Sequence, residues 1–567
     1  MNNNPFSFSW DKLTVFFEES KPSFWSSNKT KKILFKNESG KFHSKSLIGI
    51  MGPSGVGKTT FLASLAGKHR GVTGSLKLNE TLLSVQNLKH ISSYLFQEDI
   101  YVETLTVFEH FRFMNALKSK KDKNAVNKII ADFNLDKNTE IKNLSGGERK
   151  RLTLGVELLN NNQILFCDEP TTGLDSYNAN SIIKKLNFLT QKNEKLIFVT
   201  IHQPSFEIFN YFTHIILIAP NKVFYQGEKS LIKEFFETKF HLFCPKNYNP
   251  ADFYLKSISN ELISLDQNVI HQISIKSPKR LENFDLLKIN NNIFQEIYWL
   301  LWRNLIDTRR NFLYHLYQFL LLMITALILA STYSFVSSKN DDFVQNVKGI
   351  IFFFTSELIF THTYNVINTF PSEENVMMRE KNLYSTKSYF LSKLLSVIPR
   401  CILQPLMFLI INFLLIDFFN DIWVFSQMLL VLFFACISAS ILGLCISAIF
   451  TSLDYMDLFT APFELITMLA AGILIKLPSL KYLNWIKYLS PFYYTYESLS
   501  IIFWTNINEM DFKNSSMDVL NLTELGFSTK PAYIYQNIFY MNLLSLFISL
   551  ICYFTLCYRR NFCVTRL

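Results

Sequence analysis

The stretch Gly52-Pro53-Ser54-Gly55-Val56-Gly57-Lys58-Thr59-Thr60 follows the apolar run Ser46–Met51 and opens a helical pattern. A strand, a glycine-rich turn and a helix in this order are typical of a phosphate-binding loop, because backbone N–H groups of the turn and of the helix N-terminus face an anion. Lys58 supplies positive charge to the β- and γ-phosphates of a nucleotide, and Thr59 offers a hydroxyl to Mg²⁺. The stretch predicts an α/β domain that binds ATP and Mg²⁺.

A second apolar run, Ile164–Cys167, ends in the two acids Asp168 and Glu169. At the end of a buried strand, Asp168 can hold Mg²⁺ through water, and Glu169 can polarise an attacking water molecule. Two acids at a strand end also arise by chance. Together with the phosphate loop, however, they indicate ATP hydrolysis.

The segment Leu144-Ser145-Gly146-Gly147-Glu148 resembles the signature of the ABC transporter family. In that family the signature of one copy closes over ATP held by the phosphate loop of another copy. One chain has one copy of each motif, so the resemblance implies a homodimer or a heterodimer with another half transporter.

The same resemblance assigns roles to three further residues. Gln97 matches the glutamine that contacts Mg²⁺ and senses the membrane domain. Asp175, in Gly173-Leu174-Asp175, matches the loop that couples the two ATP sites. His202 matches the histidine that reads the γ-phosphate; a lone histidine after a strand is more often structural, but its place in the family's motif order favours the catalytic role.

The composition points to a membrane protein. Of the 567 residues, 49% are hydrophobic and 55 are Phe, which is too apolar for an ordinary soluble chain. The net charge of +10 comes from dispersed Lys and Arg, with no basic stripe or base-stacking motif, so we expect no nucleic-acid partner. The eight cysteines have no metal-ligand spacing and are expected to be buried hydrophobes or free thiols.

We expect an α/β P-loop ATP-binding domain at 8–260, a polar linker at 261–292 and an all-α six-helix transmembrane domain at 293–567. An amphipathic pattern at 293–310 predicts a helix on the membrane surface. The alternative to membrane spans is a large soluble core. Its buried helices would be shorter and more polar on one side than the apolar runs of this chain. Six apolar runs each reach the roughly 20 residues that cross a bilayer, and they lie at 312–335, 347–370, 389–418, 423–450, 455–475 and 534–558.

The charges that flank the runs predict a topology. Arg309 and Arg310 precede the first run, and Arg559 and Arg560 follow the last, so both termini are expected in the cytosol. The N-terminus has no apolar signal core. The loop 476–533 then lies outside, where its sequons predict N-glycans at Asn514 and Asn521. The location of the protein is either the plasma membrane or an intracellular vesicle membrane, and both alternatives are kept.

The domain order narrows the resemblance to subfamily G, which includes insect eye-pigment transporters, sterol transporters and a multidrug exporter. Local matches are Ser145–Arg151, His202–Ser205, Asn249–Phe253 and Arg379-Glu380. Many relatives carry disulfide cysteines in the last external loop, but residues 476–533 contain none, so a dimer linked through that loop is not expected. For the aromatic that stacks on adenine in other ABC subfamilies, Phe16 and Phe17 are the candidates.

Two polar stripes occur in the apolar runs. Glu357, Thr361 and Asn365 recur every four residues in the second run, and Glu464, Thr467 and Met468 share the fifth. The resemblance implies that these two spans line the central cavity. One interpretation is a hydrogen-bond network between helices; the other is a substrate path in which both glutamates are counter-charges for a cationic amphiphile.

Three functions compete. Six apolar runs argue against a soluble ABC ATPase of translation or DNA repair. An ATP-gated regulator or channel often loses one of the catalytic residues, whereas Glu169, Gln97 and His202 are all present. We therefore favour an ATPase that exports a small amphiphile, such as a lipid or pigment precursor, across the lipid bilayer. The sequence does not identify that substrate.

Overall fold

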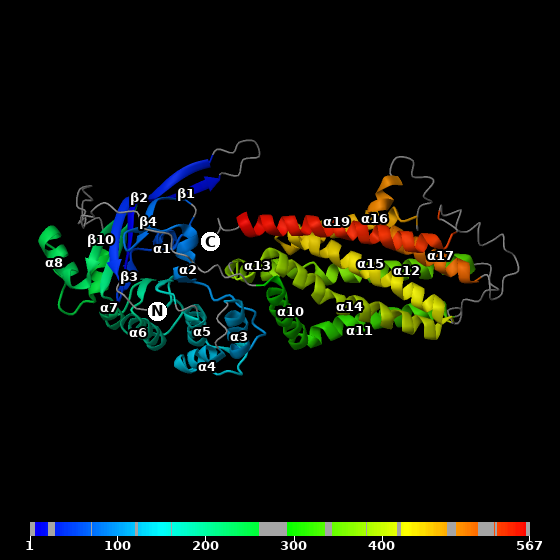
Figure 1. The fold of residues 1–567 in the computed structure, drawn as a ribbon, viewed down its shortest axis with the longest axis horizontal. Helices are drawn as coiled ribbons and strands as arrows, with labels where there is room; N and C mark the ends of the chain where they lie inside the picture. Colours follow the sequence, from blue (N-terminus) through cyan, green and yellow to red (C-terminus); the bar gives the residue numbers. More distant parts are fainter. Residues whose placement is uncertain are drawn as a thin grey trace. The chain divides into compact units, whose positions relative to one another are not determined.

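The computed structural model divides the chain into two compact units, one N-terminal up to Asn290 and one from Asn291 to Cys563. Figure 1 shows the β-sheets in the first unit and long helices in the second. The structure describes residues 6–20, 29–69, 71–118, 123–159, 162–259, 292–334, 343–381, 383–416, 421–472, 484–507, 527 and 530–562.

The first unit is built on a six-stranded sheet in the order β10-β9-β3-β8-β7-β6. Its strands run parallel except β10, which is antiparallel to β9. The central strands are buried at every position, as expected for a parallel sheet covered on both faces. The strands are β3 (Leu47–Met51), β6 (Ser92–Leu95), β7 (Ile164–Cys167), β8 (Leu196–Thr200), β9 (His214–Ala219) and β10 (Lys222–Glu228).

A second, antiparallel sheet packs against the first through aromatic side chains. Its order is β2-β1-β4-β5. Phe8 of this sheet meets the rings of Phe166 and Phe198 edge-on, with centroids 6.2 and 6.1 Å apart. Such contacts add to the burial of apolar area and fix the two sheets together. The strands are β1 (Ser7–Ser20), β2 (Lys29–His43), β4 (Val72–Leu78) and β5 (Thr81–Leu82).

The helices of the first unit begin at clear sequence signals. Thr106 and Glu109 form a capping box that starts α3, and Ser145 and Glu148 form another that starts α5. The helices are α1 (Lys58–Leu65), α2 (Val85–Ile91), α3 (Val107–Leu117), α4 (Lys123–Asp132), η1 (Ile141–Asn143), α5 (Gly146–Leu158), α6 (Ser176–Asn193), α7 (Phe206–Tyr211), α8 (Lys229–Phe240) and α9 (Pro250–Ser259).

The second unit is helical throughout its described part. In that part, five helical stretches are long and apolar enough to cross a membrane: α11, α12 continued by α13, α14, α15 and α19. They correspond to five of the six predicted runs. The elements are α10 (Ile293–Arg310), α11 (Phe312–Tyr333), α12 (Phe343–Val366), α13 (Thr369–Arg379), α14 (Thr386–Leu415), α15 (Ile422–Ile449), α16 (Leu453–Leu469), η3 (Asn484–Leu489), α17 (Pro491–Ile507) and α19 (Ala532–Phe562).

The fifth predicted run is shorter as a helix than the sequence suggested. It forms α16, which has 17 residues and ends at Leu469, below the roughly 20 residues of a full span. Gly472, just beyond it, has φ +85°, a left-handed conformation that ends helices. The six-helix expectation therefore holds approximately, with α16 as the short member.

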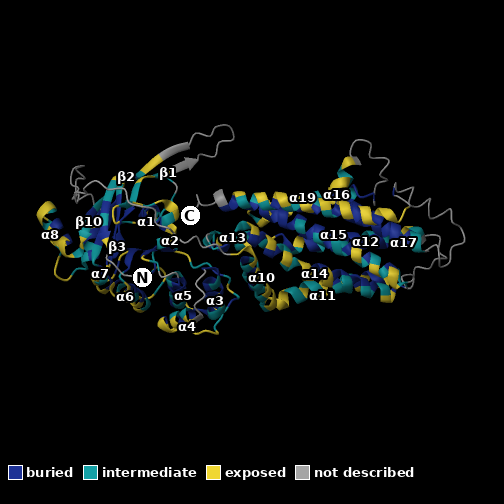
Figure 2. Ribbon diagram, viewed as in Figure 1, coloured by how far each residue is buried: buried dark blue, intermediate teal, exposed yellow. Residues whose placement is uncertain are grey.

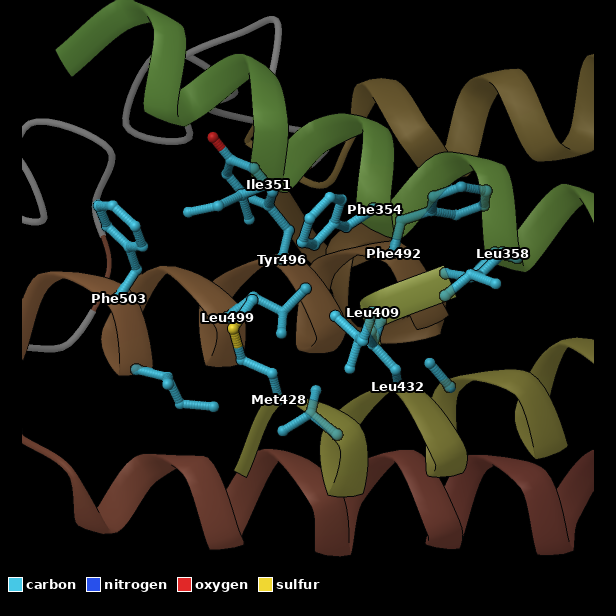
Figure 3. Close-up of a cluster of buried hydrophobic side chains, with 14 of the residues drawn as sticks. Ile351, Phe354, Leu358, Leu409, Met428, Leu432, Phe492, Tyr496, Leu499 and Phe503 are labelled. Carbon is cyan, nitrogen blue, oxygen red and sulfur yellow. The ribbon is translucent and has the colours of Figure 1, made fainter. Parts of the chain in front are cut away.

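The prediction that 476–533 is simply a loop is wrong for residues 491–507. They form α17, whose side chains Phe492, Tyr496 and Leu499 are almost fully buried. Figure 3 shows them packed between α12 and α15. Pro491 suits the first turn of a helix, and the aromatic and aliphatic residues that follow bury their surface in the bundle, which outweighs the turn signals around them.

Burial separates central from peripheral helices. In the most apolar 18-residue window, 67% of α15 is buried inside the unit, against 22% of α11 and 28% of α14 and α19. Figure 2 shows the same contrast, with α15 largely dark blue and much of α11 yellow. The apolar surfaces of α11 and α14 are therefore left for lipid or another chain.

Candidate functional site

The glycine-rich stretch forms the connection between β3 and α1. Gly57 has φ +96°, which a side chain would strain, and it caps the first turn of α1. The Lys58 Nζ donates to the carbonyl oxygens of Gly52 and Pro53 at 2.9 and 3.1 Å. Burial lowers the pKa of Lys58, and the charges of Asp168 and Glu169 oppose this shift. The ammonium group thus lies at the loop and close to both acids.

Asp168 follows β7 and lies beside the phosphate loop. Its carboxylate accepts hydrogen bonds from the hydroxyls of Thr59 and Thr200, at 3.1 and 2.7 Å, and from Tyr94 at 3.3 Å. Burial raises the pKa of Asp168, and these hydrogen bonds oppose the shift. A hydroxyl and a carboxylate oxygen side by side are hard ligands of the kind that Mg²⁺ prefers, so the residues present fit this ion.

Glu169 adopts a left-handed backbone with φ +44°. Its N–H donates to Thr200 Oγ1 at 2.8 Å, which helps to hold this conformation. Its carboxylate accepts from Gln97 Nε2 and from Thr172 Oγ1, both at 2.9 Å. Gln97 and Glu169, which are far apart in the sequence, are therefore in direct contact.

His202 lies in the loop after β8. Its Nε2 is 2.5 Å from Ser54 Oγ of the phosphate loop. The next residue, Gln203, has φ +44°, which turns the chain sharply at this point. The structure thus places His202 at the phosphate loop, where Lys58 and Thr59 also lie, although its assigned role stays a prediction.

The signature, Ser145 to Glu148, forms the start of helix α5. Ser145 caps α5 and bonds to Glu148, and Asn178 packs so closely on Gly147 that a Cβ there would lie 2.9 Å from it. Asn178 also donates to Asp175 at 2.5 Å. Within the described residues, no hydrogen bond joins Ser145 or Gly146 to the phosphate loop.

Sequence reasoning missed several supporting residues. Thr200 contacts both acids, and Tyr94 contacts Asp168, but neither was predicted as a site residue. Lys150 of α5 donates to the Gln97 carbonyl at 2.6 Å and pairs with Asp99 at 3.2 Å, which ties the signature helix to the Gln97 segment. Strands β6 and β8 flank β7, and the polar side chains near their ends were the available signal.

The adenine-stacking residue is not identified. Phe17 is 43% exposed, and its ring lies 5.5 Å from that of His69. The side chains closest to Gly57 of the phosphate loop are those of Phe35 and Leu34. Phe16 and Phe17 therefore remain predictions only.

The polar stripe of α12 is half-buried. Glu357 accepts a hydrogen bond from Thr325 of α11 at 3.0 Å, which links two neighbouring helices. Thr361 and Asn365 follow it on the same helix, and the Nδ2 of Asn365 is buried without a hydrogen-bond partner. Glu357 thus has the contact that a structural role predicts.

The stripe of α16 is fully buried. Thr467 donates to backbone carbonyls of its own helix, and Met468 belongs to the hydrophobic core. Glu464 is 0% exposed, and neither carboxylate oxygen has a hydrogen-bond partner. The nearby Thr363 hydroxyl is hydrogen-bonded to the carbonyls of Ile359 and Ala439. No hydrogen bond joins the two stripes in the described part of the chain.

Comparisons with known proteins agree with this architecture. The family model described as "ABC transporter" matches residues 35–172, and the model "ABC-2 type transporter" matches residues 295–504. The chain is 30% identical to "Protein brown" of Drosophila melanogaster, over 88% of each chain. It is 31% identical to "Protein white" of Ceratitis capitata, over 88% of this chain and 82% of that protein.

A third relative is the "Broad substrate specificity ATP-binding cassette transporter ABCG2" of Rattus norvegicus, 29% identical over 78% of this chain and 76% of that protein. An ATP-binding domain followed by a helical membrane domain defines an ABC transporter, and the chain belongs to this family. Within it, the chain is a half transporter of subfamily G, of the type of white and brown.

Proposed function

We propose that the protein hydrolyses ATP to drive export of a small amphiphile across a membrane. The observation that carries this proposal is a series of contacts just beyond the carboxyl end of β7. Thr59 donates to Asp168, and Gln97 donates to Glu169, the next residue in the chain. The family membership supports it, because this chain retains the acids, the glutamine and the histidine together. The alternative is an ATP-gated regulator or channel.

Each residue has a separate task in the proposed reaction. The backbone of Gly55 to Thr60 and the Lys58 ammonium bind the phosphates. Thr59, Asp168 and Gln97 would hold Mg²⁺, which when bound neutralises phosphate charge. Glu169 orients the attacking water and accepts its proton, and His202 contacts the γ-phosphate.

We propose that two chains share each ATP. The signature residues Ser145 and Glu148 bond to each other, and Asp175 bonds to Asn178. Among the described residues, none of these three is hydrogen-bonded to the phosphate loop of its own chain. A second chain, identical or another half transporter, would supply the missing side. Closing and opening of this pair gives a two-state element that can switch the membrane domain.

Vanadate-sensitive ATPase activity of the purified protein in liposomes tests the pump against the regulator. A pump is expected to hydrolyse ATP at about 1–10 s⁻¹, within the usual range of enzymes, and activity should change when substrate is added. Binding of ATP without any turnover would favour the regulator.

Glu464 supports a cationic substrate. A buried glutamate without a hydrogen-bond partner is costly in a membrane and tends to mark a substrate path. Thr361 and Asn365 supply polar groups on α12, while Glu357 is bound to Thr325 and supports the helix contact instead. The proposed substrate is therefore a polar or cationic amphiphile, admitted when the helices separate.

Glu464→Gln is expected to lower transport of a cationic fluorescent amphiphile about tenfold, because one charge pair in a low dielectric contributes more than 1.4 kcal/mol. ATP binding and dimer yield should stay normal. Glu357→Gln is the matched control and should change stability more than transport. Unchanged transport in Glu464→Gln would remove the cationic interpretation while leaving the ATPase proposal intact.

A further inference from the structure

Arg400 lies inside the apolar helix α14, where a charge needs compensation. Its Nη2 is 2.8 Å from Nδ1 of His315 on α11. A guanidinium stays protonated and only donates, so Nδ1 must accept and the imidazole carries its proton on Nε2. The pair therefore leaves a net positive charge between α11 and α14.

No carboxylate neutralises this charge in the described part of the chain. Arg303, Lys393 and Arg559 each form an ion pair with a glutamate, whereas Arg400 forms none. Asp307, whose charge acts on His315, accepts a hydrogen bond from Asn311. Arg560, for which no ion pair is found in the described part either, donates instead to the carbonyl oxygens of Lys381 and Tyr384.

Gln318, one turn along α11, holds the other side of the imidazole. Its side chain has a hydrogen-bonding contact with His315, and its Nε2 donates to Tyr314 at 2.9 Å. The imidazole is therefore fixed with Nδ1 toward Arg400. A guanidinium whose partner is a neutral ring, with no carboxylate beside it in the described part of the chain, indicates that an anionic group from outside the chain belongs here.

The surroundings are apolar and exposed. Leu313 and Tyr317 of α11 are 80% and 61% exposed, and Leu403 of α14 is 54% exposed. The site lies one helical turn, about 5 Å, beyond the corner at Asn311 where the amphipathic α10 ends. Since such a helix lies in the headgroup region, Arg400 reaches the depth of lipid phosphates.

We propose that the α11–α14 seam, defined by Arg400, His315 and Gln318, binds the headgroup of an anionic phospholipid in the leaflet on which α10 lies. The Arg400 fork binds the phosphate, as guanidinium groups do with two parallel N–H···O bonds. The acyl chains cover the exposed side chains of Leu313 and Leu403. A soluble phosphate would satisfy the charge but not these exposed apolar side chains.

The test measures binding of phosphatidylserine to the purified full-length protein by native mass spectrometry and by the shift in melting temperature. Phosphatidylcholine of the same acyl composition is the reference lipid. Wild-type protein is expected to retain phosphatidylserine preferentially. Arg400→Gln should lose about tenfold in affinity, the effect of removing a charge-assisted hydrogen bond, and should bind both lipids alike.

Two variants control for fold and for general attraction. Arg400→Lys keeps the charge and should lose only part of the preference. Arg309→Gln removes an exposed charge at the end of α10 and should leave the preference within about twofold. The proposal fails if Arg400→Gln keeps the preference, if Arg309→Gln loses as much, or if inorganic phosphate at millimolar concentration displaces the lipid.

Discussion

Thr200 shows how much one side chain contributes to the ATP site. Its hydroxyl donates to Asp168 at 2.7 Å and accepts from the Glu169 backbone at 2.8 Å. Asp168 is thereby held beside Thr59, and Glu169 is held in its left-handed conformation. Thr200 is thus shared by Asp168 and the Glu169 backbone, whereas the Glu169 carboxylate has its own partners in Gln97 and Thr172, so a change confined to that carboxylate need not disturb Asp168.

Replacing Glu169 with Gln is expected to leave ATP affinity near normal while hydrolysis falls by about 10²- to 10⁴-fold, the usual cost of removing a positioned base. The amide still accepts the hydrogen bond from Gln97, so the site should keep its shape. Nucleotide binding and single-turnover hydrolysis measure the two effects separately.

Glu234→Gln, at an exposed position on α8, is the control and should hydrolyse ATP normally. Near-normal turnover of the Glu169 variant would contradict the assignment of the base.

At the scale of elements, a buried polar network joins α10, α13 and α14. Arg303 of α10 donates to both oxygens of Glu380 at 2.9 and 2.7 Å, and Tyr384 donates to the same carboxylate. Glu296 of α10 accepts from Ser385 and Ser388 at the start of α14. These contacts fix the amphipathic helix to the bundle at several points.

Arg303→Met should destabilise the membrane unit by about 3–5 kcal/mol, because it leaves the Glu380 carboxylate buried and unpaired. The melting temperature of detergent-purified protein measures the loss. Arg309→Met, at the exposed end of the same helix, is expected to change it little. Adding Glu380→Met to the first variant should restore much of the stability, and a further loss instead would show that the pair is not the cause.

At the scale of the whole molecule, the proposed function needs a second chain. A Gly146→Asp chain puts a bulky negative group into the signature, and a Lys58→Ala chain weakens its own phosphate loop. Neither should hydrolyse ATP as a homodimer. In a mixed dimer, one composite site joins both lesions and the other has none, so about half of the wild-type activity is expected if the sites act independently.

Coexpression with two affinity tags isolates the mixed dimer for this ATPase assay, and a dimer of two Gly146→Asp chains is the control. Full activity of strictly monomeric wild-type protein would contradict the composite site.

N-glycans are expected at Asn514 or Asn521, which lie outside the described residues, because the proposed topology puts this segment outside the cell or in a vesicle lumen. Peptide N-glycosidase should increase the gel mobility of cell-expressed protein, and the double change to Gln should remove that shift. Asn138→Gln, in the ATP-binding unit, is the control. A protein without any shift would leave this topology unsupported.

Local sequence determined the parts of this protein that depend on neighbouring residues. The glycines and Lys58 specify a phosphate loop because backbone conformation and charge there are short-range properties. The amphipathic pattern specified α10 with its bounds, Ile293–Arg310. Long apolar runs specified most of the membrane helices because each must cross the bilayer with its own backbone bonds satisfied.

Tertiary structure alone decided the rest. Residues 491–507 look like part of a loop until α12 and α15 supply a surface on which α17 can bury its aromatic side chains. Glu357 and Glu464 look alike in the sequence, but packing gives the first a partner in Thr325 and leaves the second with none. Thr200 reaches Asp168 only because β7 and β8 are neighbours in the sheet. Each depends on which segments pack together, and long-range packing is not encoded in any local pattern.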